Sequence, residues 1–177
     1  MLAIFKKFIL SVCLLALSGC GFHLRGDMPL APPLKRLYLE TKDPYGQLTR
    51  NLKQYLKMSG VYLTSSPADA DAILVIQNEV EGQQLQSISG TQQTRQYNLT
   101  LTVLFNVSDP NGAALTGQKS VVESRPLTIQ SNQILGGSNE QANLYKQMRL
   151  AIVFDIMSVL SSQDVTDILN KLPTKKH

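Results

Sequence analysis

The sequence predicts an α+β fold in which two helices pack on one face of a four-stranded, mixed or antiparallel sheet, in the order β-α-β-β-β-α. Two sequence patterns and the length of the chain predict it. Residues 97–107 alternate apolar and polar side chains, as a half-buried strand does. Residues 48–56 and 144–160 repeat apolar side chains at helical spacing. The chain has 177 residues, of which 43% are hydrophobic, and this is enough for one core.

The first half of the domain contains one strand and one helix. Residues 34–41 alternate leucine and tyrosine with polar side chains and predict the strand. Asp43 offers an N-cap carboxylate, Pro44 suits the first helical position, and Gly60 is a typical residue at the C-terminal end of a helix. We therefore expect a helix between Asp43 and Gly60. The short run 61–64 is a further candidate strand at the sheet edge.

The middle of the chain predicts a meander of three long strands, residues 72–86, 97–108 and 121–129. The polar residues 89–93 form the tip of the first hairpin, and the Asp-Pro-Asn-Gly sequence at 109–112 forms the second turn. Along the second strand, polar side chains share a face that we expect to meet water or a polar partner. These side chains are Asn98, Thr100, Thr102 and Asn106.

A long helix follows the meander. Ser138 and Gln141 have the spacing of a capping box, so we expect the helix to begin there and to run to about Ser162. Its apolar side chains, including Met148 and Phe154, are expected in the core. A short helix is then predicted before Pro173.

The first twenty residues have the composition of an export signal. Lys6 and Lys7 precede the apolar run Phe8–Leu17, which is too short to span a bilayer as a helix, since that takes roughly 20 residues. The sequence Leu-Ser-Gly-Cys that ends at Cys20 resembles a bacterial lipobox, which implies cleavage before Cys20 and acylation of that residue. An ordinary secretory signal that happens to end in cysteine is the alternative.

These segments divide the chain into four parts. Residues 1–19 are the predicted lipoprotein signal peptide, 20–33 a lipidated, proline-containing tether, 34–172 one α+β domain, and 173–177 a disordered tail. The formal charge of the whole chain is +4, and removal of residues 1–19 takes away two lysines and no acid. The mature charge of +2 gives little support to nucleic-acid binding.

The usual parts of enzyme and metal sites are scarce. The cysteines are Cys13 and Cys20, and the histidines are His23 and His177, so the domain itself holds neither a Cys-His pair nor a histidine cluster. Glu79 and Glu81 lie two apart on a strand, which is a trivial match to a glycosidase pair. We therefore expect no enzyme activity, no cofactor and no metal, with an envelope hydrolase as a remote alternative.

Residues 20–26, Cys-Gly-Phe-His-Leu-Arg-Gly, resemble the start of the mature lipopolysaccharide-assembly lipoproteins of the LptE family. Further matches run in chain order across most of the mature sequence. They are Asp43-Pro44, Gly46, Leu48, Arg50, Gly60-Val61, Gln96-Tyr97, Leu101-Thr102-Val103, Asn139-Glu140-Gln141, Lys146 and Met148. The resemblance implies two helices on a four-stranded sheet behind a lipid anchor, and Gly21 after the cysteine implies sorting to the outer membrane.

The resemblance also implies a function. Proteins of this family plug the lumen of the outer-membrane β-barrel LptD, help it to assemble, and contact lipopolysaccharide on its way to the outer leaflet. A barrel lumen is polar, and neutral polar side chains suit contact with it. The candidate docking residues are Ser89, Gln92, Gln93, Asn98, Thr100 and Thr102. Without the resemblance, a solvated sheet face is the favoured interpretation of these residues. An adaptor for another envelope partner is a further alternative.

Basic side chains that the family uses near lipid are missing from two places in this sequence. Residues 87–94 and 131–138 contain neither lysine nor arginine. Arg95 is the cation nearest the tip and is therefore the candidate for lipid contact, because arginine binds phosphate bidentately. The alternative is that Arg95 only flanks the strand or pairs with a carboxylate of the barrel.

Overall fold

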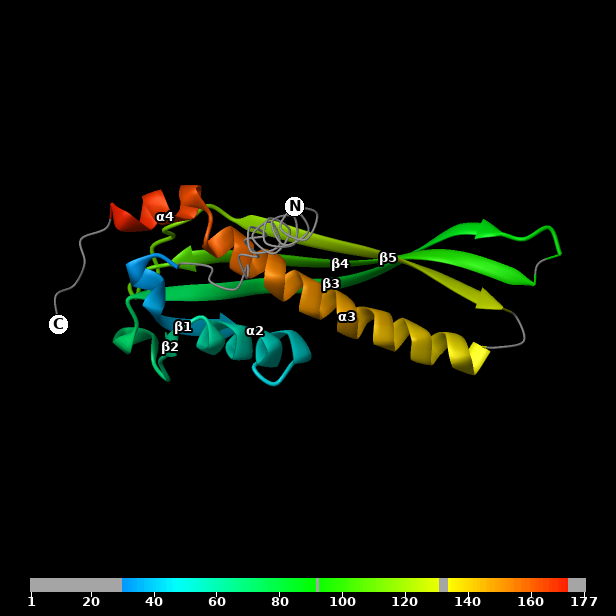
Figure 1. Ribbon diagram of the computed structural model, residues 1–177, viewed down its shortest axis with the longest axis horizontal. Helices are drawn as coiled ribbons and strands as arrows, with labels where there is room; N and C mark the ends of the chain where they lie inside the picture. Colours follow the sequence, from blue (N-terminus) through cyan, green and yellow to red (C-terminus); the bar gives the residue numbers. More distant parts are fainter. Residues whose placement is uncertain (1–29, 92, 131–133, 172–177) are drawn as a thin grey trace, which may run out of the picture.

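The computed structural model describes residues 30–91, 93–130 and 134–171. Its strands form one sheet in the order β2-β1-β3-β4-β5, which extends into a long hairpin at one end (Figure 1). The strands are β1 (Arg36–Thr41), β2 (Tyr62–Leu63), β3 (Ala72–Ile88), β4 (Thr94–Ser108) and β5 (Lys119–Gln130). β1 runs parallel to β2 and β3, whereas β3, β4 and β5 are antiparallel neighbours.

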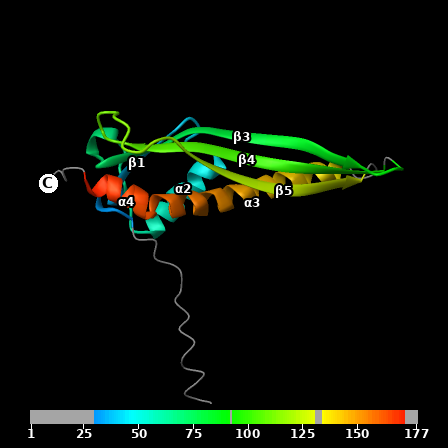
Figure 2. The ribbon, with the colours of Figure 1, turned by 90° about the horizontal axis from the view of Figure 1, so that it is seen from above.

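The α-helices lie on a single side of this sheet (Figure 2). They are α2 (Gln47–Met58), α3 (Ile134–Leu160) and α4 (Gln163–Asn170). Short 3-10 turns η1 (Pro32–Lys35) and η2 (Pro67–Asp69) precede β1 and β3. The predicted α+β class is confirmed, but the sheet has five strands because the run near Val61 pairs with the start of β1.

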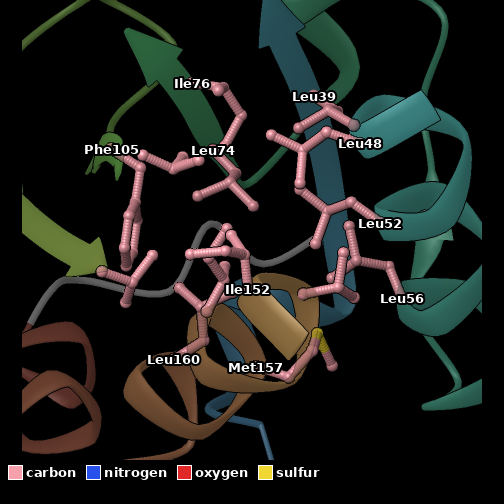
Figure 3. Close-up of a cluster of buried hydrophobic side chains, with 14 of the residues drawn as sticks. Leu39, Leu48, Leu52, Leu56, Leu74, Ile76, Phe105, Ile152, Met157 and Leu160 are labelled. Carbon is pink, nitrogen blue, oxygen red and sulfur yellow. The ribbon is translucent and has the colours of Figure 1, made fainter. Parts of the chain in front are cut away.

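The core fills the space between the helices and the end of the sheet that holds β1. Side chains from β1, β3 and β4 point toward those from α2 and α3 (Figure 3). Its labelled members are Leu39, Leu48, Leu52, Leu56, Leu74, Ile76, Phe105, Ile152, Met157 and Leu160. Full burial of one such side chain contributes about 1.5–3 kcal/mol, so this cluster stabilises the end of the molecule opposite the hairpin tip.

Two helix starts differ from their predicted positions. α2 begins after Gly46, because the Asp43 carboxylate instead accepts the backbone N–H of Tyr45, at 3.3 Å, in a turn before the helix. α3 begins at Ile134, so Ser138 lies inside the helix and the predicted capping box is wrong. The Gln141 side chain bonds to Gln83 on β3.

Two predictions about burial also need correction. Phe154 is 47% exposed and packs edge-on against Tyr55 of α2, with ring centroids 4.7 Å apart, whereas Met148 is fully buried as predicted. The predicted tether includes residues 30–33, yet Leu30 and Ala31 are buried in the core. Packed structure therefore includes the last residues of that segment. Cys20 and the tail 173–177 lie outside the described residues.

The second turn matches its prediction. The Asp109 carboxylate accepts the backbone N–H groups of Asn111 and Ala113, at 2.9 and 2.8 Å. Gly112 has a φ of 88°, which favours glycine. Of the described helices, none has both the length and the hydropathy to cross a bilayer.

Candidate docking surface

The side of the three long strands that faces away from the helices carries no charged residue. We call this surface, between the Gln77 bulge and the hairpin tip, the open face. It comprises Asn78, Val80, Gly82, Gln84 and Ser87 of β3, Gln96, Asn98, Thr100, Thr102 and Leu104 of β4, and Ser120, Val122, Ser124, Pro126 and Thr128 of β5. Hydroxyls, amides and a few aliphatic groups are thus its only side-chain chemistry.

A one-residue bulge keeps this face neutral. Ile76 pairs with Phe105, but Asn78 pairs with Leu104, so Gln77 is an extra residue in β3. A shift of one residue moves every later side chain to the opposite face of a strand. Without the bulge, Glu79 and Glu81 would lie on the open face; with it, both side chains reach α3 on the other side.

Neutral hydrogen bonds link the strands across the open face. The Ser124 hydroxyl donates to the Asn98 amide oxygen at 2.8 Å, and the Ser87 hydroxyl donates to the Gln96 amide oxygen at 2.9 Å. At the bulge, the Gln77 amide donates to Asn106 at 3.0 Å. Such bonds hold the side chains in defined positions, so the surface is ordered before any partner binds.

The centre of the open face is apolar and the end near the tip is hollow. Val80 and Val122 flank Thr102 and are 48% and 58% exposed. Nearer the tip, a hollow of about 340 Å³ is lined by residues that include Gln96, Asn98 and Thr128. An exposed apolar centre within a polar, uncharged border resembles a protein interface more closely than a plain solvated face.

On the opposite side of the sheet, three side chains of α3 bind the strand β3. Arg149 forms ion pairs with Glu79, at 2.6 Å, and with Glu81. One turn earlier the Tyr145 hydroxyl donates to the Gly82 carbonyl at 2.8 Å, and a further turn back Gln141 donates to Gln83 at 3.2 Å. We call this set the α3 zipper. It holds the helix against the hairpin and engages both glutamates in ion pairs with Arg149.

The α3 zipper predicts that the free energy of unfolding decreases at alkaline pH. Burial and, second, the charge of Glu81 raise the pKa of the Tyr145 hydroxyl above its ordinary value near 10. The folded state therefore disfavours the ionised form, and stability that is present below about pH 10 is lost as the pH rises.

We expect Tyr145→Phe to lose about 0.5–1.5 kcal/mol at pH 7 and to show a smaller decline in unfolding free energy between about pH 9 and 11. Urea unfolding measures both, with the exposed Tyr62→Phe as the control. A decline equal to the parent's would contradict this role of Tyr145.

The structure separates the predicted docking residues into two groups. Asn98, Thr100 and Thr102 form one row along the open face. Ser89 and Gln93 lie at the hairpin tip, where the Ser89 N–H donates to the Thr94 carbonyl at 2.9 Å. Gln92 lies outside the described residues.

Arg95 lies away from the open-face row. It pairs with Ile88 and Ile129 and is exposed on the helix side of the sheet. Arg125 and Arg149, by contrast, form ion pairs with glutamates. The sequence reasoning missed the β3 and β5 parts of the open face. In β3 the reason is the Gln77 bulge, which leaves no pattern in the sequence.

The chain is a small α+β domain whose long strands carry an ordered, uncharged face, while Glu79 and Glu81 on the other side are held in ion pairs with Arg149. The chain belongs to the LptE family, which is described as lipopolysaccharide-assembly and whose model matches residues 34–160. The predicted family resemblance is thereby confirmed.

Two relatives illustrate the sequence similarity. The LPS-assembly lipoprotein LptE of Yersinia enterocolitica is 38% identical over 104 residues, which are 58% of this chain and 50% of the relative. The protein of the same name from Photorhabdus laumondii is 30% identical over 105 residues, 59% of this chain and 58% of the relative. The matched part of this chain thus spans only about half the length of these relatives. Their names describe assembly lipoproteins and no enzyme.

Solved structures share the fold. A minor lipoprotein from Acinetobacter baumannii has a TM-score of 0.62 at 24% identity, covering 75% of this chain and 93% of its own. A lipoprotein B from Nitrosomonas europaea has a TM-score of 0.65 at 20% identity, covering 85% and 97%.

Proposed function

We propose that this protein is an outer-membrane lipoprotein that docks as a plug in the lumen of an LptD-like β-barrel, helps the barrel to assemble, and assists the insertion of lipopolysaccharide into the outer leaflet. The observation that carries the proposal is the open face, which is uncharged and free of α-helices. The inner wall of a large barrel is polar, and an uncharged partner surface binds it without burying unpaired charge.

The length of the hairpin supports insertion into a lumen. β3 advances from Ala72 to Ile88, and at about 3.3 Å per residue it covers roughly 50 Å. Leu30, which lies in the predicted lipidated segment 20–33, packs at the end opposite the tip. A protein anchored at that end has a reach greater than the roughly 30 Å thickness of the hydrocarbon layer. The tip, with Ser89, Gln92 and Gln93, would then lie deep in the barrel.

Co-purification tests the proposal. The tagged mature chain, extracted in detergent, is expected to bring down one large β-barrel protein in a fixed ratio, and the mass of that protein identifies it. Recovery of a different envelope protein, without a barrel, would favour the adaptor alternative. Catalytic turnover by the chain freed of every partner would favour a hydrolase.

Lipid contact at the tip is assigned to Arg95. Its guanidinium is exposed near the end of the hairpin and offers bidentate hydrogen bonds to a phosphate of the glycolipid. We expect Arg95→Ala to bind purified lipopolysaccharide more weakly than the parent, while Arg50→Ala, an exposed arginine on α2, retains parental binding. Equal binding by the parent and a folded Arg95→Ala protein would remove Arg95 from the lipid site.

A further inference from the structure

Most of β3 has a free edge. β1 pairs with β3 only as far as Thr41 and Ile76. Beyond that point β4 is the only described strand that pairs with β3. Between the bulges at Gln77 and Gln86, residues 78–85 form an uninterrupted ladder with β4, so they present one straight, unpaired edge. Edge groups of this kind readily pair with another extended chain.

The direction of the free main-chain groups follows from a proline. Pro126 of β5 has no N–H and lies opposite Asn98, so Asn98 directs its main-chain groups to Gln84 of β3. Because successive residues of an antiparallel strand point to opposite sides, Gln83 and Leu85 direct their N–H and carbonyl groups to the free edge.

The two edges of the hairpin sheet are protected to different extents. β5 carries Pro126 together with Lys119 and Arg125, which are the usual obstacles to edge pairing. The segment 78–85 has no proline or basic residue, and both of its glutamates are held in ion pairs with Arg149. Leu85, just past the end of the α3 zipper, is 47% exposed. The β3 edge is thus open and partly apolar, and Arg149 balances one of its two negative charges.

Self-pairing of two copies fits this edge poorly. In a symmetric antiparallel pair centred on Gly82, Leu85 of each copy would face Glu79 of the other. A pair centred on Glu81 would place the two Glu81 side chains directly opposite each other, and like charges in that position are destabilising. The edge therefore favours a different chain.

We propose that an extended, non-acidic segment of the barrel partner pairs with β3 over residues 78–85 and adds a sixth strand to the sheet. The identity of the partner rests on the proposed function. A protein docked on the open face lies beside this edge, and only an extended main chain supplies alternating donors and acceptors along its whole length. Because Arg149 balances only one of the two glutamate charges, the edge disfavours an acidic segment.

Two substitutions at Gln83 isolate the main-chain contact. Gln83→Pro removes the outward N–H, whereas Gln83→Ala keeps it, and both lose the side-chain bond to Gln141. We expect the proline variant of the full mature chain to recover at least tenfold less of the co-expressed LptD-like barrel than the alanine variant, with matching circular dichroism.

Hydrogen exchange on the unsubstituted complex gives an answer that does not depend on the folding of either variant. Amides in peptides covering 78–85 are expected to exchange at least tenfold more slowly in the complex than in the free chain. Unchanged exchange there in a complex that does form would overturn the added strand and leave the proposed function standing. Slow exchange that depends on self-association, detected by sedimentation of the chain alone, would also overturn it. Failure to recover any barrel would remove both proposals.

Discussion

Replacing Thr102 with arginine is expected to reduce recovery of the barrel partner at least tenfold while the protein remains folded. Thr102 lies at the centre of the open face between Val80 and Val122. In the complex the new guanidinium would be buried without a partner, and such burial costs several kcal/mol, where about 1.4 kcal/mol is already a tenfold change in affinity. In the free protein the long side chain extends into water from a half-buried position.

Two matched variants show whether charge on this face is the cause. Thr102→Val adds no charge and exchanges only a neutral hydroxyl for a methyl group, so it is expected to recover the barrel within about threefold of the parent. Leu150→Arg adds the same charge on the outer surface of α3, at a site that is 36% exposed, and is expected to have no effect on recovery. Pull-down at equal expression measures all three. Equal losses of barrel recovery from Leu150→Arg and Thr102→Arg would mean that charge on the open face has no particular effect on docking.

Cys20→Ser is expected to abolish labelling by a radioactive fatty acid and to leave the chain unprocessed or soluble in the periplasm. The physical reason is that several acyl chains give lasting membrane attachment at about 0.8 kcal/mol per buried methylene, and serine has no thiol to carry the first of them. The fold is expected to survive, because the described core begins at Leu30.

Intact mass spectrometry checks the same assignment on the unsubstituted protein. The mature chain is expected to begin at Cys20, to carry acyl groups, and to lack Cys13. Lipid still attached after Cys20→Ser would contradict the assignment.

The class of the fold could be predicted because its long elements carry their own periodicity. The alternation along β4 and the helical repeat of Met148, Ile152 and Ile156 both reflect one-sided burial, which leaves a direct pattern in the sequence. The start of α3 could not be predicted from the capping box, since the helix extends one turn further back, where Gly137 lets it approach Ile129 of β5 closely. Tertiary packing decided that boundary.

The candidate site was predictable only in part. The row Asn98, Thr100 and Thr102 is visible in the sequence because β4 has no bulge along it. The β3 part of the open face depends on the bulge at Gln77, and the residues around Gln77 do not indicate a bulge. It also depends on the long-range ion pairs of Glu79 and Glu81 with Arg149 on the other side of the sheet. Contacts between residues about seventy positions apart leave no periodic signal.

Site-specific photo-crosslinking in living cells tests the central claim most directly. A photoreactive amino acid in place of Val122 sits on the most exposed part of the open-face centre, and one in place of Leu150 sits on the outer surface of α3. Docking through the open face predicts that Val122 gives a strong adduct with a large β-barrel protein and that Leu150 gives a much weaker one. A barrel adduct from Leu150 with none from Val122 would contradict it, because the partner would then contact the helices instead of the uncharged sheet.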